Sequence, residues 1–237
     1  MPRWRDWSPR PLPQPTATAS VSILSPDFAI PQLRGGRTRR VWLYLPPGYA
    51  TSERRYPVLY MQDGQNVFDA RTSFAGEWGV DETLDSLHAA GAGGAIVVAV
   101  DNGGQRRFDE YSPWPNPEHG GGEGDAYVDF LAQTLKPYID RHYRTLPGRL
   151  HTGVAGSSMG GLISLYAALK YPDVFGRVGV FSPAFWVAPS IYAAARNAHP
   201  LPGTRIYMVT GAQEGGGAAP EVYVRDHQRM IDTLRAA

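Results

Sequence analysis

The chain has 237 residues, a formal net charge of +1 at neutral pH and no cysteine. A chain of this length can bury the core of one ordinary domain. A net charge so close to zero provides no basic surface for nucleic acid, so we expect no nucleic-acid partner. The lack of cysteine excludes disulfides, a thiolate nucleophile and cysteine-ligated metal centres. We expect no cofactor and no metal.

Nothing in the chain has the pattern of a membrane or export segment. No apolar run reaches the roughly 20 residues that a membrane-spanning helix needs. Residues 1–20 lack the apolar stretch of a signal peptide. We therefore expect no membrane partner and a cytoplasmic location.

Residues 1–20 differ in composition from the rest of the chain. They hold five prolines, three arginines and two tryptophans, Trp4 and Trp7. Proline fixes φ and removes a backbone donor, which opposes a packed helix or a central strand. We expect an extended arm over residues 1–20, followed by one domain over residues 21–237. The arm is either a mobile leader or docks on the domain through its two tryptophans.

Short apolar runs alternate with helical patterns along residues 21–237. The expected strands are residues 21–24, 39–45, 58–62, 95–100, 151–155, 178–181 and 205–210, and the expected helices are residues 80–90, 125–142, 162–170 and 222–234. Within residues 125–142, Pro137 predicts a kink or a break. The runs at 58–62 and 95–100 are typical of strands buried on both faces. This alternation predicts an α/β fold with a mostly parallel sheet flanked by helices.

A G-x-S-x-G pattern occurs at Gly156-Ser157-Ser158-Met159-Gly160. A strand-like run precedes it and a helix-like run follows it, which is the strand–turn–helix context of a nucleophile elbow. Such a turn holds the serine in a strained backbone conformation with its Oγ exposed, and the glycines make room for it. The context favours Ser158 as the nucleophile of acyl transfer. The alternative is an idle serine in a glycine-rich turn.

A serine nucleophile needs backbone N–H donors for the oxyanion that develops on its substrate. The N–H of Met159 is one by position, at the start of a helix. The second is expected from the loop after the strand at residues 58–62, where the Asp63-Gly64 turn would present the N–H of Gln65 toward Ser158. An ordinary turn at Asp63-Gly64 is the alternative interpretation.

Four segments carry a family resemblance: PVLYMQDGQNVFD at residues 57–69, IVVAVDNGGQRRFDEYSP at 96–113, GSSMGGLISLYAALKYPDVF at 156–175 and FSPAFW at 181–186. With these segments in order, the chain from about residue 37 onward resembles the putative-esterase family, which includes esterase D, enterochelin esterase, feruloyl esterase domains and the antigen 85 mycolyltransferases. The resemblance implies the α/β-hydrolase fold, Ser158 as nucleophile, and Met159 and Gln65 as oxyanion donors. It also implies that Glu214, after the strand at 205–210, is the triad acid, although a solvated loop carboxylate would give the same pattern.

No histidine stands where the family places one. The order in α/β-hydrolases is serine, acid, histidine, and the resemblance implies a histidine beyond one more helix and strand. Only His227 follows Glu214, inside the helix expected at 222–234, where a solvated helix face explains it better. His119 is a weaker alternative from the loop after residues 95–100. We expect a C-terminally incomplete domain that lacks the final strand and helix, in which Ser158 is a weak nucleophile.

The substrate pocket should be built from loops at the carboxyl ends of the strands. The longest of these, residues 101–124, mixes aromatic, charged and glycine residues. Such a loop suits a polar small-molecule ester: an acylated sugar, a feruloyl or acetyl ester, or a siderophore. The expected substrate-binding residues are Asn102, Arg106, Tyr111, Trp114 and Trp186. Segment 111–114 could equally pack as a lid without ligand contact.

Together these patterns predict a serine carboxylic-ester hydrolase that works through an acyl-enzyme on Ser158. Two other classes stay open. One is an acyltransferase on the same scaffold, which needs a pocket for a second alcohol. The other is a non-catalytic binding protein that has lost its base. A homo-oligomer is compatible with all three.

Overall fold

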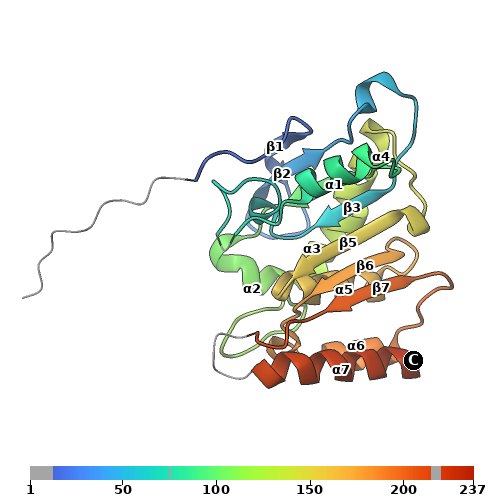
Figure 1. The fold of residues 1–237 in the computed structure, drawn as a ribbon. Helices are drawn as coiled ribbons and strands as arrows, with labels where there is room; N and C mark the ends of the chain where they lie inside the picture. Colours follow the sequence, from blue (N-terminus) through green and yellow to red (C-terminus); the bar gives the residue numbers. More distant parts are fainter. Residues whose placement is uncertain (1–12, 75, 215–219) are drawn as a thin grey trace, which may run out of the picture.

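The computed structural model describes residues 13–74, 76–214 and 220–237 (Figure 1). The strands are β1 (Val21–Ala29), β2 (Thr38–Tyr44), β3 (Val58–Met61), β4 (Ile96–Val100), β5 (Thr152–Ser157), β6 (Arg177–Phe181) and β7 (Arg205–Val209). The helices are α1 (Val80–Ala89), α2 (Arg107–Glu110), α3 (Gly124–Phe130), α4 (Lys136–His142), α5 (Met159–Lys170), α6 (Ile191–Asn197) and α7 (Pro220–Ala236). Every expected strand and helix is present, and α2 and α6 are additional. None of the helices in these residues is long and apolar enough to cross a bilayer.

The strands form one mixed sheet in the order β1-β2-β4-β3-β5-β6-β7. β2 pairs antiparallel with both β1 and β4, and the remaining pairs, from β4 to β7, are parallel. The predicted mostly parallel α/β sheet is therefore confirmed. Because parallel strands end at the same edge of a sheet, the loops after β3, β4, β5, β6 and β7 gather at one edge.

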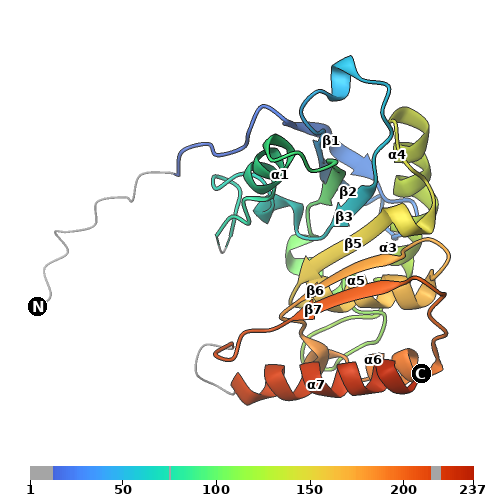
Figure 2. The same ribbon diagram turned by 45° about the vertical axis from the view of Figure 1, so that its right-hand side comes forward.

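Helices cover the two faces of the sheet unequally (Figures 1 and 2). Helices α3 to α6 pack on one face around the larger core, to which β4 contributes Ile96, Val98 and Val100. Helix α1 packs on the other face over a smaller cluster that contains Val97 and Ala99. All five residues of β4 are buried, because both faces of this central strand are covered.

Strand β7 lies at the edge of the sheet, next to β6. Tyr207 and Val209 on this strand are 64% and 38% exposed. An apolar groove of 850 Å³ lies beside it on the face that α1 leaves open, with Trp78, Phe181 and Tyr207 among its walls. Below β7, α7 packs against α6 (Figure 1). Among the described residues, β7 therefore leaves one edge of the sheet exposed.

The helical region expected at residues 125–142 runs from Gly124 to His142. A π-helical segment, Leu131–Leu135, precedes Pro137, and the N–H of Lys136 bonds to the carbonyl of Leu131 five residues back. This wider turn takes up the position at which proline cannot donate a hydrogen bond. The predicted interruption is therefore a change of helix type, and the chain does not break there.

Residues 13–20 run beside α1. Thr16 Oγ1 donates to Glu77, the N–H of Thr18 donates to Asp81 Oδ2 at 2.7 Å, and Ser20 Oγ donates to Asp85 at 3.1 Å. This end of the predicted arm is therefore held by polar contacts. Trp4 and Trp7 lie outside the described residues, so docking through them stays a prediction.

Candidate active site

Ser158 occupies the tight turn between β5 and α5. Its backbone has φ 57° and ψ −120°, a conformation that a residue with a side chain adopts only under strain. The N–H of Ser158 donates to the carbonyl of Phe181 at 2.9 Å, and the N–H of Ala184 donates to the carbonyl of Ser158 at 3.1 Å. The segment after β6 therefore holds the turn in place. The strand–turn–helix predicted from the glycine pattern is present.

A cavity of 630 Å³ opens at the carboxyl edge of the sheet, and Ser158 lines it. The loops after β3 and β4 and the segment before α1 provide most of its wall. Residues in the wall that bear on the chemistry are Asp63, Gln65, Trp78, Asn102, Arg107 and Ser157. All six histidines of the chain fall within the described ranges, and none of them lines this cavity.

The N–H groups of Gln65 and Met159 each lie at the start of a helical turn. Gln65 belongs to the 3₁₀ turn Gly64–Asn66 after β3, and Met159 is the first residue of α5. The first N–H groups of a helix have no acceptor within that helix, which leaves both free to donate to a ligand. Gln65 lines the cavity beside Ser158, and its side-chain oxygen accepts the N–H of Asn102 at 3.2 Å.

Asp63 connects the loop after β3 to the elbow. Its carboxylate accepts hydrogen bonds from Arg107 Nε at 2.7 Å, Arg107 Nη2 at 2.8 Å and Asn102 Nδ2 at 2.6 Å. Arg107 Nη2 also donates to the carbonyl of Ser157 at 3.4 Å. Burial alone would lower the pKa of Arg107, but the hydrogen bonds to Asp63 outweigh it and raise that pKa. A charged pair therefore joins the Gln65 turn to the end of β5.

Glu214 follows β7 at the same edge of the sheet. Its Oε1 accepts a hydrogen bond from Ser182 Oγ at 2.5 Å and one from the N–H of Gly211 at 3.2 Å. Ser182 itself comes directly after β6 and has a positive φ of 42°. The carboxylate is thus oriented by the neighbouring loop, on the side of Ser158 away from Gln65, because β6 and β7 follow β5 in the sheet.

The two histidines weighed as alternatives lie elsewhere. The ring of His119 packs edge-on against that of Trp186 in the loop after β6, with 5.3 Å between the ring centroids. His227 is half-buried in α7, where burial lowers its pKa, and its Nδ1 is buried without a hydrogen-bond partner. His227 therefore lies on a partly exposed side of α7 and does not line the cavity.

Residues 34–229 match the family described as Putative esterase. The chain belongs to this family. Its enzyme class is accordingly that of the carboxylic ester hydrolases.

Individual relatives agree with this assignment. The uncharacterized protein YbbA of Bacillus subtilis is 31% identical over 187 residues, which are 75% of this chain and 69% of YbbA. The iron(III) enterobactin esterase of Dickeya dadantii is 30% identical over 179 residues, 73% of this chain but only 35% of that enzyme. The crystal structure of the BES protein from Bacillus cereus superposes with a TM-score of 0.71 at 20% identity, covering 95% of this chain and 85% of that one. At that identity the superposition shows a shared fold.

Two of the expected substrate-binding residues of this esterase need correction. Tyr111 is fully buried, and its hydroxyl accepts the N–H of Asp63 at 3.1 Å, so it supports the loop from within the core and does not contact substrate. Arg106 turns toward Asp109, 3.3 Å away, with its side chain 62% exposed. Its neighbour Arg107 lines the cavity instead, because α2 begins there and adjacent helical residues point in different directions.

The remaining expected residues divide between the cavity and its surroundings. Asn102 lines the cavity. Trp114 packs edge-on against Tyr166, with 5.2 Å between ring centroids, and Trp186 packs against His119. Neither tryptophan is part of the wall of this cavity, so a substrate contact by either one stays a prediction. The alternative, in which segment 111–114 packs as a lid without ligand contact, is compatible with the burial of Tyr111 and Ser112.

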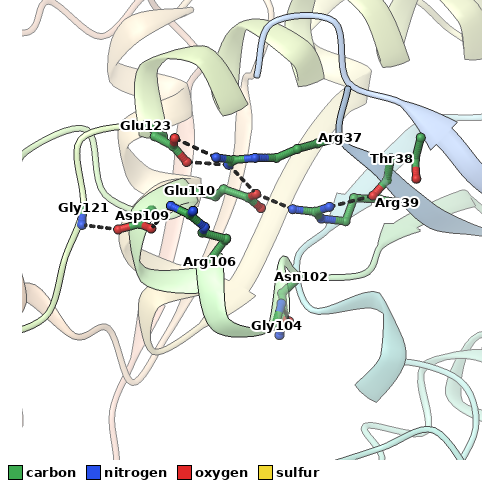
Figure 3. Close-up of polar contacts among 10 residues, drawn as sticks. All are labelled: Arg37, Thr38, Arg39, Asn102, Gly104, Arg106, Asp109, Glu110, Gly121 and Glu123. Atoms are coloured by element: carbon green, nitrogen blue, oxygen red, sulfur yellow. Dashed lines mark hydrogen bonds and ion pairs between the residues drawn. The ribbon is translucent and has the colours of Figure 1, made fainter. Parts of the chain in front are cut away.

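The loop of residues 101–124 is fixed by charged side chains around Glu110 (Figure 3). Glu110 is fully buried and pairs with Arg37 at 2.8 Å and with Arg39, while Arg37 also pairs with Glu123. Both arginines belong to the segment that enters and begins β2. The helix that carries Arg107 is therefore anchored to the sheet, which gives Asp63 a partner in a fixed position.

Replacing Arg107 by Met should lower kcat for ester hydrolysis about 10²-fold relative to the parent chain. Asp63 would lose its two-pronged partner, and a displacement of about 1 Å in a site of this kind has an effect of that size. Steady-state kinetics on p-nitrophenyl acetate measures the effect. The matched control is Arg106→Met, which removes the same charge one residue away and should leave kcat unchanged. Equal losses in the two variants would show that Arg107 does not position the loop.

Proposed function

We propose that this esterase uses Ser158 as a nucleophile and forms an acyl-enzyme. Ser158 Oγ attacks the ester carbonyl and gives a tetrahedral oxyanion; when this collapses, the bond to the alcohol breaks, and the alcohol leaves with the proton from serine. Water then hydrolyses the acyl-serine. The observation that carries this proposal is the strained conformation of Ser158 at a strand–turn–helix junction that opens into a cavity of 630 Å³.

The oxyanion is assigned to the N–H groups of Met159 and Gln65. Both start helical turns at the same edge of the sheet, and Gln65 and Ser158 line one cavity. Donors held in place before the reaction stabilise charge that develops only in the transition state. The loss of one such donor lowers kcat about 10²- to 10³-fold in known hydrolases.

Glu214 is assigned as the carboxylate of the triad. Its contact with Ser182 supports this role, since that loop lies next to the elbow. A carboxylate of this kind acts by orienting a histidine and stabilising the imidazolium. Because none of the six histidines lines the cavity, the base that takes the Ser158 proton has to come from outside this wall.

A polar ester with an aromatic or otherwise flat acyl group suits the cavity as a substrate. Gln65, Asn102 and Arg107 supply polar groups, and Trp78 and Phe74 supply apolar surface. Two relatives are named as an iron(III) enterobactin esterase and a siderophore triacetylfusarinine C esterase. We therefore favour a siderophore-like, feruloyl or acylated-sugar ester, hydrolysed in the cytoplasm.

Covalent labelling tests the nucleophile. The chain is incubated with a fluorophosphonate in imidazole buffer, so that the buffer provides a base, and the modified residue is identified by mass spectrometry. We expect modification of Ser158, no modification in Ser158→Ala, and normal modification in the matched control Ser157→Ala. Labelling of a different serine, or none at all, would reject Ser158 as the nucleophile.

A further inference from the structure

Three carboxylates converge at the start of α1. Glu77, Asp81 and Glu82 each place one carboxylate oxygen within 4.8 Å of the other two. Asp81 is fully buried, and Glu77 and Glu82 are half-buried. Residues 13–20 cross this cluster, since Thr16 Oγ1 donates to Glu77 and the N–H of Thr18 donates to Asp81.

Each of these carboxylates also has a buried oxygen with no hydrogen-bond partner. The atoms are Glu77 Oε1, Asp81 Oδ1 and Glu82 Oε2. The hydroxyl oxygen of Thr18, whose N–H donates to Asp81, is also buried without a hydrogen-bond partner. Among the described residues, no lysine, arginine or histidine forms an ion pair with any of the three. Buried polar atoms are normally satisfied, so four unsatisfied oxygens together call for a positive partner.

The helix dipole is too weak to explain the cluster. An acidic residue in the first turn of a helix gains only a small stabilisation from the helix dipole. The desolvation of one unpaired buried carboxylate costs more than this gain, and repulsion among three carboxylates adds to the cost. Burial raises the pKa of Glu82, and the hydrogen bond to Asp81 and the charges of Asp81 and Glu77 raise it further.

We propose that Glu77, Asp81 and Glu82 bind a Ca²⁺ ion. Carboxylate and hydroxyl oxygens are the ligands that this hard cation prefers, at 2.3–2.6 Å. The three carboxylate oxygens all lie within 4.8 Å of one another, so one cation can contact all of them. Ca²⁺ accepts irregular coordination by carboxylates, whereas Mg²⁺ demands near-octahedral geometry and usually keeps several waters. The assignment is independent of the chemistry of Ser158.

The bound ion would brace one wall of the active-site cavity. Trp78 lies between Glu77 and α1 in the sequence, and it lines both the cavity and the apolar groove. Its backbone N–H donates to the carbonyl of Asn66 at 2.9 Å. Residues 13–20, the segment of Trp78 and α1 would all be tied to one centre.

Calcium binding to the 237-residue chain tests the proposal directly. Isothermal titration with CaCl₂ after removal of metals by EDTA should show one ion bound per chain, and saturating Ca²⁺ should raise the Tm by about 5 °C over the EDTA sample. Tb³⁺, which takes calcium sites, should show luminescence excited through the indole of Trp78. Absence of binding at millimolar CaCl₂, or tighter binding of Mg²⁺ than of Ca²⁺, overturns the proposal.

Asp81→Asn separates a calcium site from a merely acidic patch. It should abolish Ca²⁺ binding, yet in EDTA its Tm should equal or exceed that of the parent chain, because one of three repelling charges is gone while the amide oxygen still accepts from Thr18. Glu82→Gln should behave in the same way. Asp85→Asn is the matched control, one turn further along α1, where the carboxylate accepts from Ser20 and Tyr44. It should keep Ca²⁺ binding, and unchanged binding in Asp81→Asn would contradict the site.

Discussion

Hydrolysis of p-nitrophenyl acetate by residues 1–237 should run about 10⁴- to 10⁶-fold more slowly than by a serine esterase with a complete triad. The physical reason is the wall of the Ser158 cavity, which includes the proposed nucleophile and the proposed oxyanion donor Gln65 but no histidine. A serine hydroxyl with no base nearby is a weak nucleophile. What remains would come from the N–H groups of Met159 and Gln65 and from binding.

Added imidazole tests whether the missing base limits the rate. With imidazole, hydrolysis by the parent chain should be faster than hydrolysis by imidazole alone, and Ser158→Ala should remove that difference. An ordinary enzymatic rate without imidazole, lost in His119→Ala or in His227→Ala, would mean that the chain moves one of these histidines to Ser158, and our assignment of the base would be wrong.

The sequence predicted the backbone of this site better than its side chains. Strand runs and the glycine spacing around Ser158 are local patterns, and they predicted the ends of β5 and α5 to within three residues. The direction of a side chain on a short helix depends on the residue at which the helix begins. The sequence does not show where α2 begins, so it cannot tell which of Arg106 and Arg107 points into the cavity. Tyr111 was expected to contact substrate because aromatic loop residues often do. In the structure it is buried in the core, where its hydroxyl accepts a hydrogen bond from the backbone N–H of Asp63.

The sequence also could not predict side-chain contacts between residues far apart in the chain. Asp63 and Arg107 are 44 positions apart, and no periodicity of the sequence connects them. The same is true of Thr18 and Asp81, which are 63 positions apart. An acidic residue in the first turn of a predicted helix looks ordinary in sequence. Only the fold, by burying Asp81 and bringing Glu77 beside it, shows that these charges need a partner.

Replacing Gly156 by Ala should destabilise the fold by about 3 kcal/mol, the upper part of the usual range for overpacking. A Cβ at this position would lie 2.6 Å from both the carbonyl carbon and the carbonyl oxygen of Gly160, and 2.8 Å from Cγ of Gln62. The first two contacts are backbone atoms of the first turn of α5, so the strain can be relieved only by moving the helix away from β5. Because that shift also displaces Ser158 relative to Gln65, the variant should lose hydrolysis as well.

Urea unfolding, followed by circular dichroism, measures the change in the free energy of unfolding. Gly148→Ala is the matched control, because Gly148 has φ −67° and an added Cβ meets no atom within 4 Å. Its stability should stay within about 0.5 kcal/mol of the parent chain. The difference between the two variants isolates steric contact from the entropy that any Gly→Ala change removes from the unfolded chain. If Gly156→Ala proves as stable as Gly148→Ala, the close approach of β5 to the first turn of α5 is not what holds Ser158 in its strained conformation.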